Sequence, residues 1–196
     1  MPSAHPPAAT PQTNVKAGFQ TVWSPWLRSL HWVLAVSMIA SFVTHEGAGT
    51  LHEVLGYVAG AAAFLRVLLG FAGAGYWPFR QFVRSPATTL AYTRDLLAHR
   101  EKRYLGHNPL GGWMVLALLA DAIACGLTGW MSTTDRFFGV AWVGNLHDAV
   151  GHALVPLLLL HLAGVVFTSW RHRENLVAAM VHGKKRALEE QANTPL

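Results

Sequence analysis

The chain has 196 residues, of which 52% are hydrophobic and only 13% are charged. This composition is too apolar for an ordinary soluble domain and predicts a small integral membrane protein. The formal net charge is +5, but the basic residues lie beside apolar segments, where they orient a protein in a membrane, so we expect no nucleic-acid partner.

Residues 1–22 are predicted to form a disordered tail, because this segment begins with a stretch rich in proline, alanine and threonine. No basic region is followed there by an apolar stretch, so we expect no secretory signal peptide. Two apolar segments follow, at residues 26–44 and 51–71. Each is long enough to cross a hydrocarbon layer of ~30 Å as a helix.

A polar and basic loop spans residues 73–107. Within it, a Ser-Pro pair predicts a short helix over residues 85–99 that lies on the membrane surface. Further spanning segments are predicted at residues 110–130 and 146–171, and residues 173–196 are predicted to form an interfacial helix and tail. The chain has one cysteine and no Cys-x-x-Cys motif, which argues against an internal disulfide, a covalently attached haem and an iron–sulfur cluster.

The distribution of basic residues predicts the topology. Thirteen of the fifteen Lys and Arg residues fall on one side of a four-span arrangement, while Arg136 falls on the other side and Arg66 lies within a span. By the positive-inside rule, both termini are expected in the cytoplasm. The predicted fold is therefore an all-α integral membrane bundle of four transmembrane helices, residues 23–172, with short interfacial helices on the cytoplasmic side.

Four histidines are predicted to lie at two matched depths. His147 and His161 are fourteen residues apart in the fourth span, so they share one helix face at a separation of about 21 Å. His52 opens the second span at the depth of His147, and His31 lies near the cytoplasmic end of the first span at the depth of His161. His152 is predicted to face away from this side of the helix.

A short repeat accompanies the outer pair, since Leu-His-acid-x-x-Gly occurs at residues 51–56 and again at 146–151. Gly56 and Gly151 lie one turn from their histidines and leave room for a flat macrocycle. Any one of the four histidines alone could be a hydrogen-bonded packing residue. Four at matched depths favour two haem irons, each held by two imidazoles, over zinc or copper, which would need further ligands.

Two arginines are candidate partners for the haem propionates. Arg28 lies one turn before His31, and Arg66 lies inside the second span. A buried arginine there needs an anionic partner. For Arg66 that partner is either a propionate or Asp121 of the third span, and the sequence leaves both roles open.

Several motifs then carry a family resemblance. They are Arg28-x-x-His31-Trp32, His52-Glu53-x-Leu55-Gly56-Tyr57, the run from Arg103 to Gly112, Thr128-Gly129-Trp130 and the pair His147/His161. Together they resemble the bacterial cytochrome b561 and Ni/Fe-hydrogenase b-type cytochrome family, from Trp23 to about Arg186. The resemblance implies a di-haem b-type cytochrome of the inner membrane, with His31, His52, His147 and His161 as the ligands of two b haems.

One departure from the pattern is His45, which lies fourteen residues after His31 on the same face and could replace His52 as a ligand. The Leu-His-acid-x-x-Gly repeat favours His52.

The resemblance implies electron transfer between quinone and a redox protein, such as a hydrogenase, a dehydrogenase or a cytochrome c. The alternative is a self-contained quinol-linked oxidoreductase such as a superoxide oxidase, although the sequence identifies no catalytic residue for one. A membrane scaffold without haem is disfavoured by the paired histidine depths. The basic loop from Arg80 to Arg103 is expected to contact lipid headgroups rather than to dock a partner.

Overall fold

The computed structural model of the chain describes residues 18–47, 49–72 and 75–187. Four of its helices are long and apolar enough to cross a membrane. They are α1 (Pro25–Val43), α2 (Gly49–Phe71), α5 (Pro109–Ser132) and α6 (Ala141–Arg171). The predicted all-α membrane fold with four spans is therefore confirmed.

Local signals explain where these helices begin. The Ser24 hydroxyl accepts a hydrogen bond from the backbone N–H of Leu27 at the start of α1. At the start of α5, the side-chain amide oxygen Oδ1 of Asn108 accepts one from the backbone N–H of Gly111. In both helices proline occupies the first turn, where it needs no hydrogen-bond partner. The fourth helix begins five residues earlier than predicted, because Val143 packs into the bundle with only 1% of its surface exposed.

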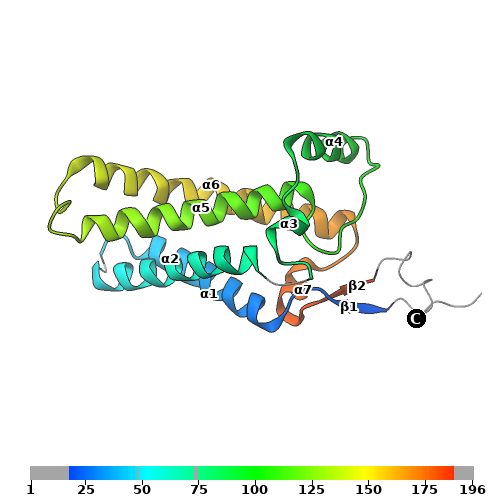
Figure 1. Cartoon of the computed structure of the whole chain (residues 1–196), viewed down its shortest axis with the longest axis horizontal. Helices are drawn as coiled ribbons and strands as arrows, with labels where there is room; N and C mark the ends of the chain where they lie inside the picture. The colour runs from blue at the N-terminus through cyan, green and yellow to red at the C-terminus, as the bar shows by residue number, and fades with distance from the viewer. Residues whose placement is uncertain (1–17, 48, 73–74, 188–196) are drawn as a thin grey trace, which may run out of the picture.

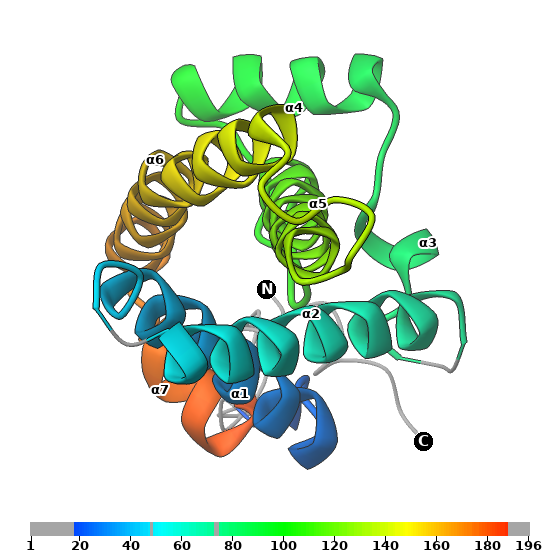
Figure 2. The same cartoon turned by 90° about the vertical axis from the view of Figure 1, so that its left-hand side faces the viewer.

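The four long helices pack in sequence order, α1 on α2, α2 on α5 and α5 on α6 (Figures 1 and 2). The closest approach of α2 and α5 is at Gly60 and Gly126, where a Cβ atom added to Gly126 would lie 3.2 Å from the Cα atom of Gly60. Small residues at a helix interface allow such close packing between membrane helices. Large apolar side chains such as Leu159 and Leu160 remain exposed on the outside of α6, where lipid would cover them.

The shorter elements gather at one end of the bundle, which we call the capped end (Figure 1). They are α3 (Phe79–Phe82), α4 (Pro86–Leu97), α7 (Leu176–His182) and the strands β1 (Phe19–Thr21) and β2 (Lys184–Arg186). The other end, which we call the open end, consists of the α1–α2 and α5–α6 turns (Figure 1). The helix predicted for residues 85–99 is α4, and it lies outside the bundle on the side of α5 and α6 (Figures 1 and 2).

The prediction for the N-terminal tail needs a correction. Residues 1–17 lie outside the described part of the chain, but residues 19–21 of the predicted disordered tail form β1. This strand pairs antiparallel with β2, and Phe19 lies opposite Arg186. The short sheet is ordered because its hydrogen-bond partner comes from the other end of the chain, which a reading of the tail alone does not include.

Ion pairs hold the capped end together. The guanidinium of Arg171, the last residue of α6, donates two hydrogen bonds to the carboxylate of Glu101, at 2.7 and 3.2 Å. Arg103 donates to Glu174 at 2.8 Å, and Lys185 lies 3.7 Å from the same carboxylate. Burial opposes ionisation of Glu101, but the hydrogen bond and charge of Arg171 outweigh it and lower the pKa of this carboxyl below its usual value.

Candidate functional site

The structure brings the rings of His52 of α2 and His147 of α6 together inside the bundle, near the open end. Their ring centroids are 5.9 Å apart, and the ring planes are nearly perpendicular, at 86°. Two imidazoles that bind one metal ion from opposite sides have centroids about 6 Å apart, since each metal–nitrogen bond is about 2 Å and each centroid lies about 1 Å behind its nitrogen. The spacing of this pair therefore fits shared coordination of one iron.

Hydrogen bonds fix the protonation of both rings. Nδ1 of His52 lies 2.8 Å from the carbonyl oxygen of Ser41, so it carries the proton and donates it. Nδ1 of His147 lies 3.0 Å from Oγ1 of Thr128. That hydroxyl donates its own hydrogen to the carbonyl of Ala124 at 2.7 Å, so it accepts from His147. Both rings therefore keep Nε2 unprotonated and free to coordinate a metal, the usual arrangement of metal-ligating histidines.

Sequence reasoning missed Ser41 and Thr128 as partners of the histidines. Both are buried, with 8% and 4% of their surface exposed. The one indication in the sequence is the Thr128-Gly129-Trp130 motif, which does not by itself show what the threonine bonds. Gly129 also contributes, because a Cβ atom added there would lie 3.2 Å from Cε1 of His147. A larger residue would push the imidazole out of position.

The two glycines of the Leu-His-acid-x-x-Gly repeat have different surroundings. A Cβ atom added to Gly151 would meet no atom within 4 Å in the described part of the chain, so open space lies beside this helix face. One added to Gly56 would make an ordinary contact with the Ser41 hydroxyl at 3.6 Å. Gly151 thus leaves space in the way the repeat predicts, whereas Gly56 packs against α1.

The second predicted pair, His31 of α1 and His161 of α6, lies closer to the capped end. Both rings are half-buried, and within the described residues no ring contact joins them of the kind that joins His52 and His147. His31 also packs edge-on against Trp32, with 5.5 Å between the ring centroids.

A fifth histidine, His107, lies close to this inner pair and was not predicted as a site residue. Its ring packs between Trp23 and Phe82, with centroid distances of 4.9 and 4.8 Å. Burial, followed by the charge of Arg66, lowers the pKa of His107 to about 3, so the ring is neutral. Its Nδ1 atom is buried and has no hydrogen-bond partner among the described residues. The sequence placed His107 within a family motif but offered no chemistry for it.

The two predicted arginines also present unpartnered nitrogens. Arg28 donates to the carbonyl of Val181 through Nη1, but its Nε is buried without a partner in the part of the chain that the structure describes. Arg66, which is 7% exposed, donates to the carbonyl of Trp77 at 3.0 Å, while its Nη1 has no partner within the same residues. The Arg66 guanidinium also lies over the ring of Phe79, 5.4 Å from the centroid.

The alternative ion pair between Arg66 and Asp121 is not formed. None of the ion pairs within residues 18–47, 49–72 and 75–187 joins them, and Oδ2 of Asp121 has no partner there. Arg66 instead reaches toward the capped end to bond Trp77. Buried polar nitrogens without partners are costly. The guanidinium nitrogens of Arg28 and Arg66 suit an anionic group with several oxygens, as the haem propionates have, and Nδ1 of His107 suits the same group when it carries the ring proton.

His45, the alternative ligand to His52, is paired elsewhere. Its ring lies 6.4 Å from that of His152, and the ring planes meet at 81°. His152 is exposed.

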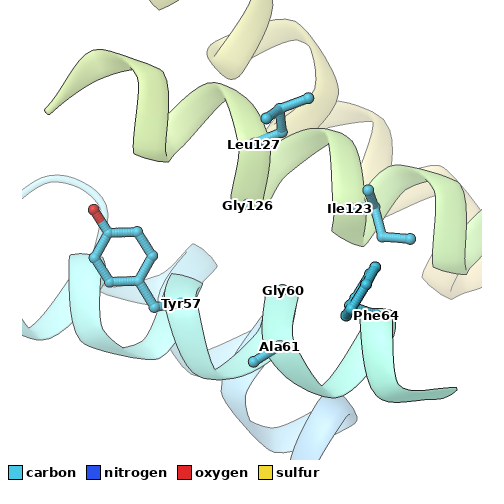
Figure 3. Close-up of a pocket in the computed structure, with 7 residues that line it drawn as sticks. All are labelled: Tyr57, Gly60, Ala61, Phe64, Ile123, Gly126 and Leu127. Carbon is cyan, nitrogen blue, oxygen red and sulfur yellow. The ribbon is translucent and has the colours of Figure 1, made fainter. Parts of the chain in front are cut away.

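An apolar groove of about 310 Å³ lies between α2 and α5 (Figure 3). Its lining comes from both helices and includes Tyr57, Phe64, Ile123 and Leu127, around the close contact of the two glycines. At its rim, the hydroxyls of Tyr57 and Thr133 are hydrogen-bonded at 3.1 Å. Among the described residues, no histidine lines this groove, so it is separate from the imidazole pairs.

Comparison with known proteins shows the family. The family model of prokaryotic cytochrome b561 matches residues 22–183. The chain is 27% identical to a probable Ni/Fe-hydrogenase B-type cytochrome subunit of Azotobacter vinelandii, over 83% of this chain and 86% of the relative. Proteins of the same name from Rhodobacter capsulatus and Cupriavidus necator are 25% and 24% identical, and the matches cover 84% and 87% of this chain and 80% and 87% of the relatives. This multi-pass membrane protein with facing imidazoles in its bundle therefore belongs to the prokaryotic cytochrome b561 family of b-type cytochromes.

Proposed function

We propose that this b-type cytochrome holds two haems per chain and carries electrons between quinone in the membrane and a redox protein. The observation that carries the proposal is the His52–His147 pair. Its rings are 5.9 Å apart and both Nδ1 atoms are engaged in hydrogen bonds. A bis-imidazole site of this kind suits a low-spin haem that exchanges electrons without binding substrate at its iron.

We assign the outer haem to His52 and His147 and the inner haem to His31 and His161. Haem iron, when bound, supplies one-electron redox chemistry. Ser41 and Thr128 hold the outer imidazoles in the metal-binding tautomer and make them more basic ligands. These hydrogen bonds would stabilise the oxidised, more positive iron relative to the reduced iron.

The inner site is proposed to include three residues that bind the propionates. Arg28, Arg66 and His107 each present a buried nitrogen that lacks a partner among the described residues. Two guanidinium groups would neutralise the carboxylates, and the neutral His107 ring would add one hydrogen bond. These side chains would also fix the rotational orientation of the macrocycle between α1 and α6.

The proposed location is the bacterial inner membrane, with the capped end and both termini in the cytoplasm. The gathering of β1, β2, α4 and α7 at one end supports this orientation, because these elements and the loops beside them carry most of the basic residues (Figure 1). In that orientation the two haem sites lie at different depths. They would connect a reaction at one membrane face to a reaction at the other.

The proposed partners follow from this arrangement. A carrier buried in the bilayer needs a lipid-soluble donor or acceptor, which favours quinone. A hydrogenase is the favoured class of redox protein, because the relatives are named as hydrogenase cytochrome subunits. A dehydrogenase and a cytochrome c remain as outcomes of the partner test.

The decisive experiment counts haems in the purified protein and in ligand variants. Pyridine haemochrome analysis should give two b haems per chain for the wild type. His147→Ala and His161→Ala should each retain one haem, while His152→Ala should retain both. One haem or none in the wild type would overturn the di-haem proposal.

The quinone assignment has a separate test. In reconstituted vesicles, a quinol analogue should reduce both haems without any added protein. If it reduces neither while a protein partner reduces both, the chain is a relay between proteins and the quinone assignment is wrong.

A further inference from the structure

Besides the two proposed pairs of haem ligands, a further pair of imidazoles lies at the open end. His45 is in the turn after α1 and His152 is in α6, and their ring centroids are 6.4 Å apart. The ring of Phe42 packs against both, at 5.4 and 6.2 Å. The pair therefore has a defined geometry, supported by a shared aromatic contact, rather than being two independent surface side chains.

The ring nitrogens of this pair are set as they are in metal ligands. Nδ1 of His45 lies 2.6 Å from the carbonyl oxygen of Phe42, and Nδ1 of His152 lies 2.8 Å from that of Asp148. A carbonyl oxygen can only accept, so each Nδ1 carries the proton in the neutral ring and each Nε2 keeps its lone pair. Hydrogen bonding from the non-coordinating nitrogen to a backbone carbonyl is the usual support of a metal-binding imidazole.

The surroundings suit a hydrated ion rather than a macrocycle. The side chain of His45 is 44% exposed and that of Glu46 is 88% exposed, and the Glu46 carboxylate lies 3.8 Å from Nε2 of His45. A haem requires apolar walls on both faces, which these exposed side chains do not provide. Two imidazoles, with a carboxylate beside that of His45, instead provide nitrogen and oxygen donors that first-row divalent metals accept.

We propose that His45 and His152 bind one divalent transition-metal ion through their Nε2 atoms at the open end. Copper(II) should bind most tightly, followed by nickel or zinc, as the usual order of stability predicts. The described residues contain no preformed cluster of three or more His, Cys, Asp or Glu ligands. Water therefore occupies the remaining positions, with the Glu46 carboxylate within reach.

Such an ion would link the first and last membrane helices. The long helices pack in the order α1, α2, α5 and α6, so α1 and α6 are the two ends of that series. His45 follows the end of α1, and His152 lies within α6. An ion that binds both imidazoles only in the folded protein stabilises the folded state, and its binding should raise the melting temperature.

The test uses the full-length, haem-loaded protein in detergent, without a polyhistidine tag and after treatment with a chelator. Copper(II) is titrated and followed by electron paramagnetic resonance. The expected result is one bound copper per chain, with hyperfine structure from two imidazole nitrogens and a higher melting temperature. His45→Ala and His152→Ala should each weaken binding at least about tenfold. His182→Ala, which removes an exposed imidazole at the capped end, should bind like the wild type.

Two results would overturn the proposal. One is wild-type copper binding no tighter than that of a variant lacking both His45 and His152. The other is loss of a haem from either single variant, because the pair would then serve the cofactor. Haem content is measured in the same samples, so failure of the copper site with two haems retained leaves the cytochrome proposal intact.

Discussion

The hydrogen bond between Thr128 and His147 should control how tightly the outer haem is held. Thr128→Val keeps the shape of the side chain but removes the oxygen that lies 3.0 Å from Nδ1 of His147. The ring N–H then loses this acceptor and keeps only the nearby backbone carbonyl of Cys125, and the loss of one such hydrogen bond costs about 0.5–1.5 kcal/mol. This corresponds to about a 2- to 12-fold weaker affinity for the outer haem. Transfer of haem to apomyoglobin, followed by absorbance, measures the change.

The matched control is Thr128→Ser, which retains the hydroxyl and should release haem nearly as slowly as the wild type. Because the inner pair lies elsewhere in the bundle, only one of the two haems should become labile in Thr128→Val. The reasoning is refuted if Thr128→Val and Thr128→Ser release haem at the same rate. It is also refuted if both haems are released equally fast from Thr128→Val.

The capped end and the topology give two further predictions. Glu101→Gln should lower the free energy of unfolding by about 1.5–3 kcal/mol near neutral pH, since it weakens a charge-assisted contact with Arg171, and thermal melting in detergent measures the loss. Because the pKa of Glu101 is below its usual value, its stabilising contribution is complete above the usual carboxyl pKa and disappears as the pH falls through the lowered value. A deficit that stays constant at acid pH would contradict this account. Separately, a reporter that is active only outside the cytoplasm should be active when fused after Gly47 or Arg136 and silent after Arg94, and the opposite pattern would reverse the proposed orientation.

The membrane helices were predictable because their signal is local. Length, hydropathy and the caps at Ser24 and Asn108 lie within each segment, so the first three spans are correct to within two residues at each end. The β1–β2 sheet was not predictable, because a three-residue strand has no pattern of its own and depends on a partner at the far end of the chain. Residues 188–196 of the predicted C-terminal segment lie outside the described residues.

The candidate site shows the same division between local and tertiary information. Helical periodicity placed His147 and His161 on one face, but it could not show that His52 would meet His147 at 5.9 Å. Thr128 was overlooked because threonine in membrane helices commonly bonds its own backbone, as Thr128 also does. Ser41 was overlooked because it accepts from His52 through its backbone carbonyl, which no side-chain pattern indicates. The sequence left both a propionate and Asp121 open as partners of Arg66, because it could not show that the long arginine side chain reaches the backbone carbonyl of Trp77.

The pairing of β1 with β2 has a consequence for how the protein is made. Phe19 is synthesised before the first of the four membrane helices, whereas Arg186 follows the last of them. The sheet can form only after all four helices have been synthesised, so the first strand must wait until then for its partner. Gly183, whose backbone carbonyl accepts hydrogen bonds from Val22 and Trp23, arrives equally late. The β1–β2 sheet therefore forms only after the nascent chain has produced all four helices of the bundle.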